Sequence, residues 1–196
     1  GGQVGGIVED EVNGEHRTTG TYSQDETAQM ELHDGTTVEV PMGTVDTTLT
    51  LEVILTDRNV NPTNGAASGR IAIHENLTIT IAGDPELQRA ITMDVPYPDA
   101  DNDGFVDGTR VRETTLSLYW YNTASSRWEM TLSSEVHADE NFIRATTYHL
   151  TEFGAFGTGR ASISGDYDGD EVSDLAIFDQ NTGAWYIRTL SGTLLA

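Results

Sequence analysis

The stretch TAQMELHDGTTVEVPMGTVDTTLTLEVILTD, residues 27–57, decides the fold class. Apolar and polar residues alternate in short runs, and turn-forming segments such as HDG and PMG separate these runs. A side-chain period of two is typical of a strand that buries one face and exposes the other. The alternating apolar residues are Met30 and Leu32, then Val38 and Val40, then Leu49, Leu51 and Val53. The stretch therefore predicts short, half-buried β-strands.

The same pattern continues along the chain. Further candidate strands lie in residues 70–83, 90–98, 115–130 and 141–157. Many short strands at a spacing of about 8 to 12 residues are typical of a β-sandwich. We expect an all-β protein, an antiparallel β-sandwich followed by a small β-hairpin.

The composition divides the chain into four parts. Residues 1–20, rich in Gly and charge, predict a linker or a peripheral strand, and residues 21–157 the sandwich domain. Residues 158–164 predict a second linker. In residues 165–196, the segments DLAIFD and AWYIRTL flank QNTG, which is a hairpin signal. Because a lone hairpin is only marginally stable in water, we expect it to pack on the sandwich, on a partner or on further chain.

Charge and cysteine content exclude several functions. The formal net charge is −22, from 32 acidic and 10 basic residues. Such a chain has no electrostatic attraction for phosphate backbones or anionic membrane surfaces, so we expect neither nucleic-acid binding nor membrane insertion. The absence of Cys excludes disulfides, thiol catalysis and thiolate metal sites.

The stretch DADNDGFVDG, residues 99–108, crowds four aspartates into one loop. Like charges at this spacing repel unless solvent or a cation intervenes. The spacing D-x-D-x-D-G-x-x-D matches a Ca²⁺-binding loop through its ninth position. Arg110 stands where such a loop carries a bidentate Glu, so Glu113 or another carboxylate would complete the shell. The predicted ligands are the side chains of Asp99, Asp101, Asp103 and Asp107 and the carbonyl of Phe105; the alternative is a solvated acidic turn.

The tail resembles one FG-GAP (VCBS-type) repeat, the unit of integrin-like β-propellers. The matching segments are Gly165, the loop DYDGDEVSD, the strand LAIF and NTGAWYI. Glu171 stands where that family usually has Gly. The match covers part of a propeller blade and implies a second Ca²⁺ loop, whose ligands would be Asp166, Asp168, Asp170 and Asp174 with the Val172 carbonyl.

The sandwich resembles secreted bacterial modules that carry DGTTVEVPMG near the start and HLTEFG near the end. These are similar to the sandwiches of ankyrins, netrin receptors and the GAIN domain of adhesion receptors. Several members of these groups cleave their own backbone at a His-Leu-Thr or His-Phe-Ser tripeptide. Residues His149, Leu150 and Thr151 match it. The resemblance implies, as an alternative function, cleavage between Leu150 and Thr151 by the Thr151 hydroxyl with His149 as base.

Other chemistry has less support. The histidines form no H-x-H or H-E-x-x-H pair, and the clustered carboxylates lie in glycine-containing loops rather than as an acid and base across a cleft. We therefore expect no catalysis on external substrates. Five aromatic residues could line a carbohydrate platform, although alternating strand aromatics more often pack in cores: Trp120, Tyr121, Trp128, Trp185 and Tyr186.

Together these patterns predict a calcium-stabilised structural or adhesive module of a larger secreted or cell-surface bacterial or archaeal protein. The expected partners are other protein chains or further domains of the same protein, with surface glycans as a further candidate. The alternatives are a self-cleaving sandwich and a carbohydrate-binding module of a secreted enzyme.

Overall fold

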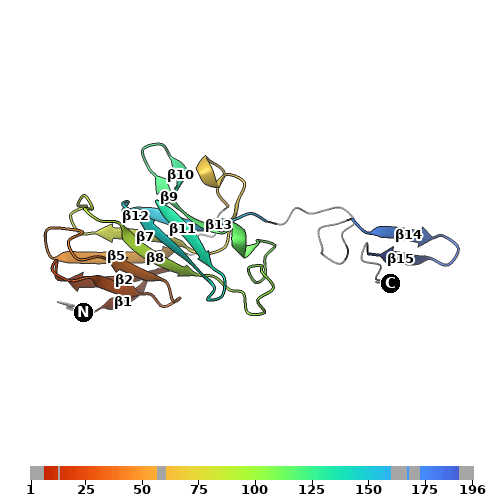
Figure 1. Cartoon of the computed structure of the whole chain (residues 1–196), viewed down its shortest axis with the longest axis horizontal. Helices are drawn as coiled ribbons and strands as arrows, with labels where there is room; N and C mark the ends of the chain where they lie inside the picture. Colours follow the sequence, from red (N-terminus) through yellow and green to blue (C-terminus); the bar gives the residue numbers. More distant parts are fainter. Residues whose placement is uncertain (1–6, 13, 57–60, 160–166, 168–172, 190–196) are drawn as a thin grey trace. The chain divides into compact units, whose positions relative to one another are not determined.

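The computed structural model describes residues 7–12, 14–56, 61–159, 167 and 173–189. The chain divides into two compact units, Gly1–Gly159 and Arg160–Ala196. In the first unit two β-sheets pack against each other, and the described part of the second holds one hairpin (Figure 1). The predicted fold class, an all-β antiparallel sandwich followed by a small hairpin, is confirmed.

The larger sheet runs from the N-terminal strands to the β9–β10 hairpin. Its order is β1-β2-β5-β7-β13-β9-β10, and β6 also pairs with β13. Every pair in it is antiparallel. The bounds in sheet order are β1 Val8–Val12, β2 Glu15–Tyr22, β5 Leu49–Thr56, β7 Asn76–Ile81, β13 Glu152–Gly157, β9 Ser117–Asn122 and β10 Arg127–Met130, with β6 at Ile71–Ala72.

The smaller sheet has the order β11-β12-β8-β4-β3 and is also antiparallel. Its strands are β11 Ser133–His137, β12 Phe142–Thr147, β8 Ile91–Pro96, β4 Thr37–Val40 and β3 Ala28–Glu31. Two 3₁₀ turns, η1 Gly65–Ala67 and η2 Glu113–Thr115, lie in the connections. Among the residues described, no helix has the length and apolar content needed to cross a membrane.

The core lies between the two sheets and follows from the period-two pattern. In β5, each of the four apolar residues at alternate positions is buried, and the intervening residues are half-buried. β8 shows the same alternation. Residues of both strands belong to one buried cluster, including Leu51, Val53, Met93 and Val95. Removing this apolar surface from water is the main stabilising contribution to a sandwich of this kind.

Two expected boundaries shift in the structure. The linker or peripheral strand expected for residues 1–20 overlaps β2, which pairs along its whole length with β5 and buries Thr18. At the other end, Thr158 and Gly159 belong to the sandwich rather than to a linker. Thr158 N donates to Thr115 Oγ1, and Gly159 forms a bridge with Val111. Glycine-rich, charged composition did not reveal these pairings because they depend on contacts distant in sequence.

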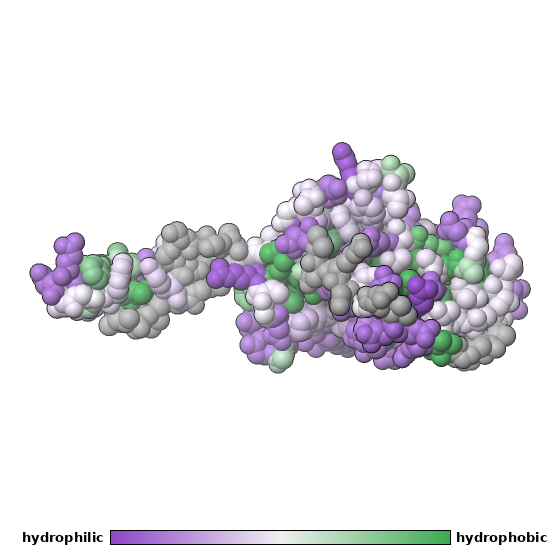
Figure 2. Space-filling view, turned by 180° about the vertical axis from the view of Figure 1, so that it is seen from behind, coloured by the Kyte–Doolittle hydropathy of each residue, from purple (hydrophilic) through white to green (hydrophobic). Residues whose placement is uncertain are grey.

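The second unit presents a two-stranded sheet, β14 Leu175–Asp179 and β15 Ala184–Arg188. Five of its large apolar side chains are 46–57% exposed: Leu175, Ile177, Phe178, Trp185 and Tyr186. The register opposes Ile177 to Tyr186 and Phe178 to Trp185, so these two pairs lie on opposite faces. Hydrophobic patches are visible on this hairpin in Figure 2, whereas hydrophilic and weakly polar residues cover most of the visible sandwich surface.

A candidate cation site in the loop after β8

The acidic loop follows β8 and is held to the sandwich by buried neighbours. Tyr97, Val106 and Val111 are all buried in the core. Asp107 N donates to Pro98 O, and Val106 N donates to Val111 O. The loop is therefore irregular in backbone but anchored at both ends, as a ligand-binding loop on a rigid scaffold requires.

Local hydrogen bonds curl the loop around its aspartates. Asn102 and Gly104 have φ values of 52° and 84°, a left-handed conformation that Asn and Gly adopt most readily. Asp103 N donates to Asp99 Oδ1 at 3.2 Å, and Ala100 N donates to Asp107 Oδ2 at 3.0 Å. Alternate carboxylates are thereby turned toward a common centre.

Three of the four predicted carboxylates meet there. One carboxylate oxygen from each of Asp99, Asp101 and Asp107 lies within 4.8 Å of the others. Asp101 and Asp107 are exposed, whereas Asp99 is only 2% exposed and its Oδ2 has no hydrogen-bond partner. A buried carboxylate oxygen without a partner is costly unless a cation or a water neutralises it. Carboxylate oxygens on a turning backbone are the ligands that Ca²⁺ prefers.

The other predicted ligands of this loop have different surroundings. Asp103 is not among the three carboxylates that meet there, and its Oδ1 accepts a hydrogen bond from Phe105 N at 2.9 Å. Phe105 forms a bridge with Arg112, whose guanidinium lies over the Phe105 ring. Asp103 therefore shapes the turn.

Glu113, named as a possible completing ligand, faces the same loop. Its backbone N donates to Gly104 O, and its Oε2 accepts the Tyr97 hydroxyl at 3.0 Å. Burial and the Glu113 carboxylate both raise the pKa of Tyr97 far above its usual range. Tyr97 therefore stays protonated and fixes the Glu113 side chain.

Asn141, in the turn between β11 and β12, contacts the acidic loop, which the sequence did not indicate. Its side-chain Nδ2 donates to the backbone carbonyl of Asp99 at 2.9 Å, and its backbone carbonyl accepts a hydrogen bond from Tyr97 N at 2.9 Å. Its Oδ1 is buried without a hydrogen-bond partner. Asn141 lies 42 positions from Asp99 and carries no motif, so only the folded chain reveals that it supports the acidic loop.

The second predicted calcium loop lies almost entirely outside the described residues. The predicted ligands that fall outside them are Asp166, Asp168, Asp170 and Val172. Asp174 is described, and its Oδ2 accepts a hydrogen bond from Tyr167 N at 2.7 Å. This contact closes the ends of the predicted loop on each other.

The His149-Leu150-Thr151 tripeptide precedes β13. The His149 ring stacks on Trp120 with centroids 3.6 Å apart, and burial lowers the pKa of His149 although Glu129 acts in the opposite direction. The Thr151 hydroxyl instead donates to the Tyr121 carbonyl at 2.9 Å. Within the described part of the chain, no hydrogen bond joins the His149 ring to this hydroxyl. The contact that proton transfer requires is missing in this conformation.

The aromatic residues of the sandwich pack mainly on one another. Trp128 is buried and meets Tyr121 and Phe156 edge-on, at centroid distances of 5.3 and 4.9 Å. Trp120 is half-buried against His149. Trp185 and Tyr186 are exposed, but on the hairpin of the second unit. The five aromatic residues thus form no shared platform within the sandwich.

No protein-family model matches this chain, and no curated protein matches it significantly.

Proposed function

We propose that this chain is a calcium-stabilised structural or adhesive module of a larger secreted or cell-surface bacterial or archaeal protein. In this proposal a Ca²⁺ ion bound by Asp99, Asp101 and Asp107 fixes the loop after β8, and the sandwich performs no catalysis on external substrates. The observation that carries the proposal is the buried, unpartnered Oδ2 of Asp99 beside two further carboxylates.

Charge and setting support the choice of calcium. The formal net charge of −22 disfavours a compact chain, and a bound divalent cation offsets part of it. A site with three carboxylates and partial exposure fits the weak extracellular class, with a dissociation constant of about 10⁻⁴–10⁻³ M. Such a site fills only where free Ca²⁺ is abundant, which agrees with the expected extracellular location.

The proposed partners are other chains or further domains of the same protein. The exposed apolar side chains on both faces of the β14–β15 hairpin support this part of the proposal. Exposed apolar surface of this kind and unpaired strand edges recruit further protein.

Thermal unfolding with and without calcium tests the proposal. Free Ca²⁺ at about ten times its dissociation constant should stabilise the fold by ~1.4 kcal/mol. For a chain of this size the melting temperature should rise by about 3–6 °C relative to EDTA. Asp101→Asn should lose this gain, while Asp46→Asn, which removes an exposed carboxylate elsewhere, should keep it.

Two results of these melts would contradict the proposed site. If wild type melts at the same temperature in EDTA and in calcium, the chain has no stabilising calcium site. If Asp101→Asn keeps the full gain and Asp168→Asn loses it, calcium acts at the predicted loop of the second unit instead.

A further inference from the structure

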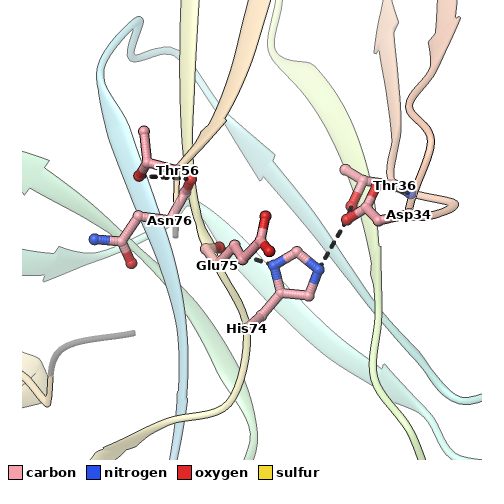
Figure 3. A network of polar contacts seen from close by, with 6 residues as sticks. All are labelled: Asp34, Thr36, Thr56, His74, Glu75 and Asn76. Carbon is pink, nitrogen blue, oxygen red and sulfur yellow. Dashed lines mark hydrogen bonds and ion pairs between the residues drawn. The ribbon is translucent and has the colours of Figure 1, made fainter. Parts of the chain in front are cut away.

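His74 lies at the corner between β6 and β7, and both of its ring nitrogens face hydrogen-bond acceptors (Figure 3). Nδ1 is 2.8 Å from the Glu75 carbonyl oxygen, and Nε2 is 2.9 Å from Asp34 Oδ2. A carbonyl oxygen and an ionised carboxylate can only accept. Both nitrogens therefore need a proton for both contacts to be hydrogen bonds, and a ring with two N–H groups is a cationic imidazolium.

The two ends of this contact belong to different sheets. Asp34 lies in the turn between β3 and β4 of the smaller sheet. The histidine's corner is fixed to the larger sheet, because Ile73 N donates to Ala155 O and Asn76 Nδ2 donates to Glu152 Oε1, both on β13. The pair thus connects two layers through side chains that are 12% and 19% exposed.

Asp34 is held in place independently of the histidine. Thr36 N donates to Oδ1 at 2.9 Å and the Thr36 hydroxyl donates to Oδ2 at 2.8 Å, across a turn in which Gly35 has a φ of 88°. Burial acts to raise the pKa of Asp34, but the hydrogen bonds from His74 and Thr36 lower it to about 2. The Asp34 carboxylate is therefore charged over nearly the whole pH range, and Thr36 keeps it in position to accept from His74.

The charged groups around the ring favour the imidazolium. Burial alone would lower the pKa of His74, but the contacts with Asp34 and Glu75 raise it above its usual value of 6.5. From the β3–β4 turn, His33 also lies beside Asp34, but its ring stacks on His16 of β2.

We propose that the ion pair between His74 and Asp34 is a pH-dependent link between the two sheets, called the lock below. As an imidazolium, His74 ties the β3–β4 turn to the β6–β7 corner. Loss of one ring proton leaves a nitrogen lone pair facing an oxygen lone pair, so one of the two contacts becomes repulsive. The positive charge that pairs with Asp34 is also lost, so the tie is weakened. Unlike a histidine contact that weakens on acidification, this one weakens as the pH rises.

The signs of both titrations define the pH range of the lock. Since the pKa of folded His74 is raised, its contribution to stability is complete below pH 6.5 and disappears as the pH rises through the folded value. Since the pKa of folded Asp34 is lowered, its contribution is complete above pH 3.8 and disappears as the pH falls through about 2. Between pH 3.8 and pH 6.5 both groups are charged and contribute fully to stability.

Nitrogen NMR of the histidine rings tests the charge state directly. At about pH 5.5 the His74 ring should show two protonated nitrogens, and its titration should give a pKa above 6.5. Asp34→Asn, which keeps an oxygen that can accept from Thr36 N, should lower that pKa. A wild-type pKa at or below 6.5 would overturn the proposal even if the variant does not fold.

Thermal melts across pH test the mechanical consequence. Between about pH 6 and pH 9 the wild-type melting temperature should fall by more than that of His74→Gln, which has no titrating ring. His137→Gln, on the outer strand β11, is the matched control and should keep the wild-type dependence. Equal pH dependence in wild type and His74→Gln would show that the ring does not tie the sheets together.

Discussion

Among the loop aspartates, Asp99 is distinguished by its burial. Asp101 and Asp107 can be solvated without a ligand, but Asp99 Oδ2 is enclosed and has no protein donor. A buried charge without a counter-charge destabilises a fold, whereas the same charge paired with a cation does not. The apo and calcium-bound proteins should therefore respond in opposite ways to removal of this one charge.

Asp99→Asn tests that contrast. The amide oxygen can still accept from Asp103 N, so the change removes charge with little change in shape. In EDTA the variant should be at least as stable as wild type, and in calcium it should show none of the wild-type gain. Chemical denaturation under both conditions measures this. A variant that is equally destabilised with and without calcium would mean that Asp99 has only a structural role.

At the scale of elements, η1 packs against the edge strand β10 through a glycine. Gly65 has a φ of 70°, and a Cβ built there would lie 2.1 Å from the Trp128 carbonyl oxygen. Asn64 Nδ2 also donates to Ser126 O, in the turn before β10. The close approach of the two backbones leaves no room for a side chain.

Gly65→Ala should therefore destabilise the sandwich more than Gly69→Ala. Both positions have left-handed φ angles, but a Cβ at Gly69 meets nothing within 4 Å. Backbone strain alone costs about 1 kcal/mol, and displacement of β10 should bring the cost at Gly65 to about 3 kcal/mol. Equilibrium urea unfolding measures both, and equal losses would show that η1 does not pack this tightly.

The β14–β15 hairpin leads to a prediction about association. Its apolar side chains are exposed on both faces, so burial against another protein surface should be favourable. Wild-type chain should self-associate in sedimentation experiments at tens of micromolar, and Ile177→Glu should reduce this. Gln180→Glu adds the same charge in the turn after β14 and should leave association unchanged. A wild type that stays monomeric would remove self-association from the proposed function.

For the whole molecule, the excess of 22 negative charges opposes compaction. Salt screens repulsion between exposed charges, with a Debye length of about 10 Å at 0.1 M. In EDTA, the melting temperature should rise by a few degrees between low salt and about 0.3 M KCl. Millimolar calcium added at constant 0.15 M KCl should give a further rise, because it barely changes ionic strength and acts by binding. No response to KCl would show that net repulsion contributes little to stability.

The sequence by itself determined the fold class and the acidic loop. Alternation in strands such as β5 places one face in the core, because the side-chain period of a strand is two, and the burial follows that pattern. The spacing of the loop aspartates also indicated a cation site, since a curling backbone turns alternate carboxylates toward one centre. Both inferences depend only on residues close in sequence.

The tertiary structure decided the rest. Asp103 accepts a hydrogen bond within a local turn and does not lie with the other three carboxylates. Asn141, 42 positions from Asp99, donates to its carbonyl. The tie between Asp34 and His74 exists only because the sandwich stacks one sheet on the other. Contacts between sheets depend on how two separate surfaces meet, and residue spacing along one chain segment carries no information about that meeting.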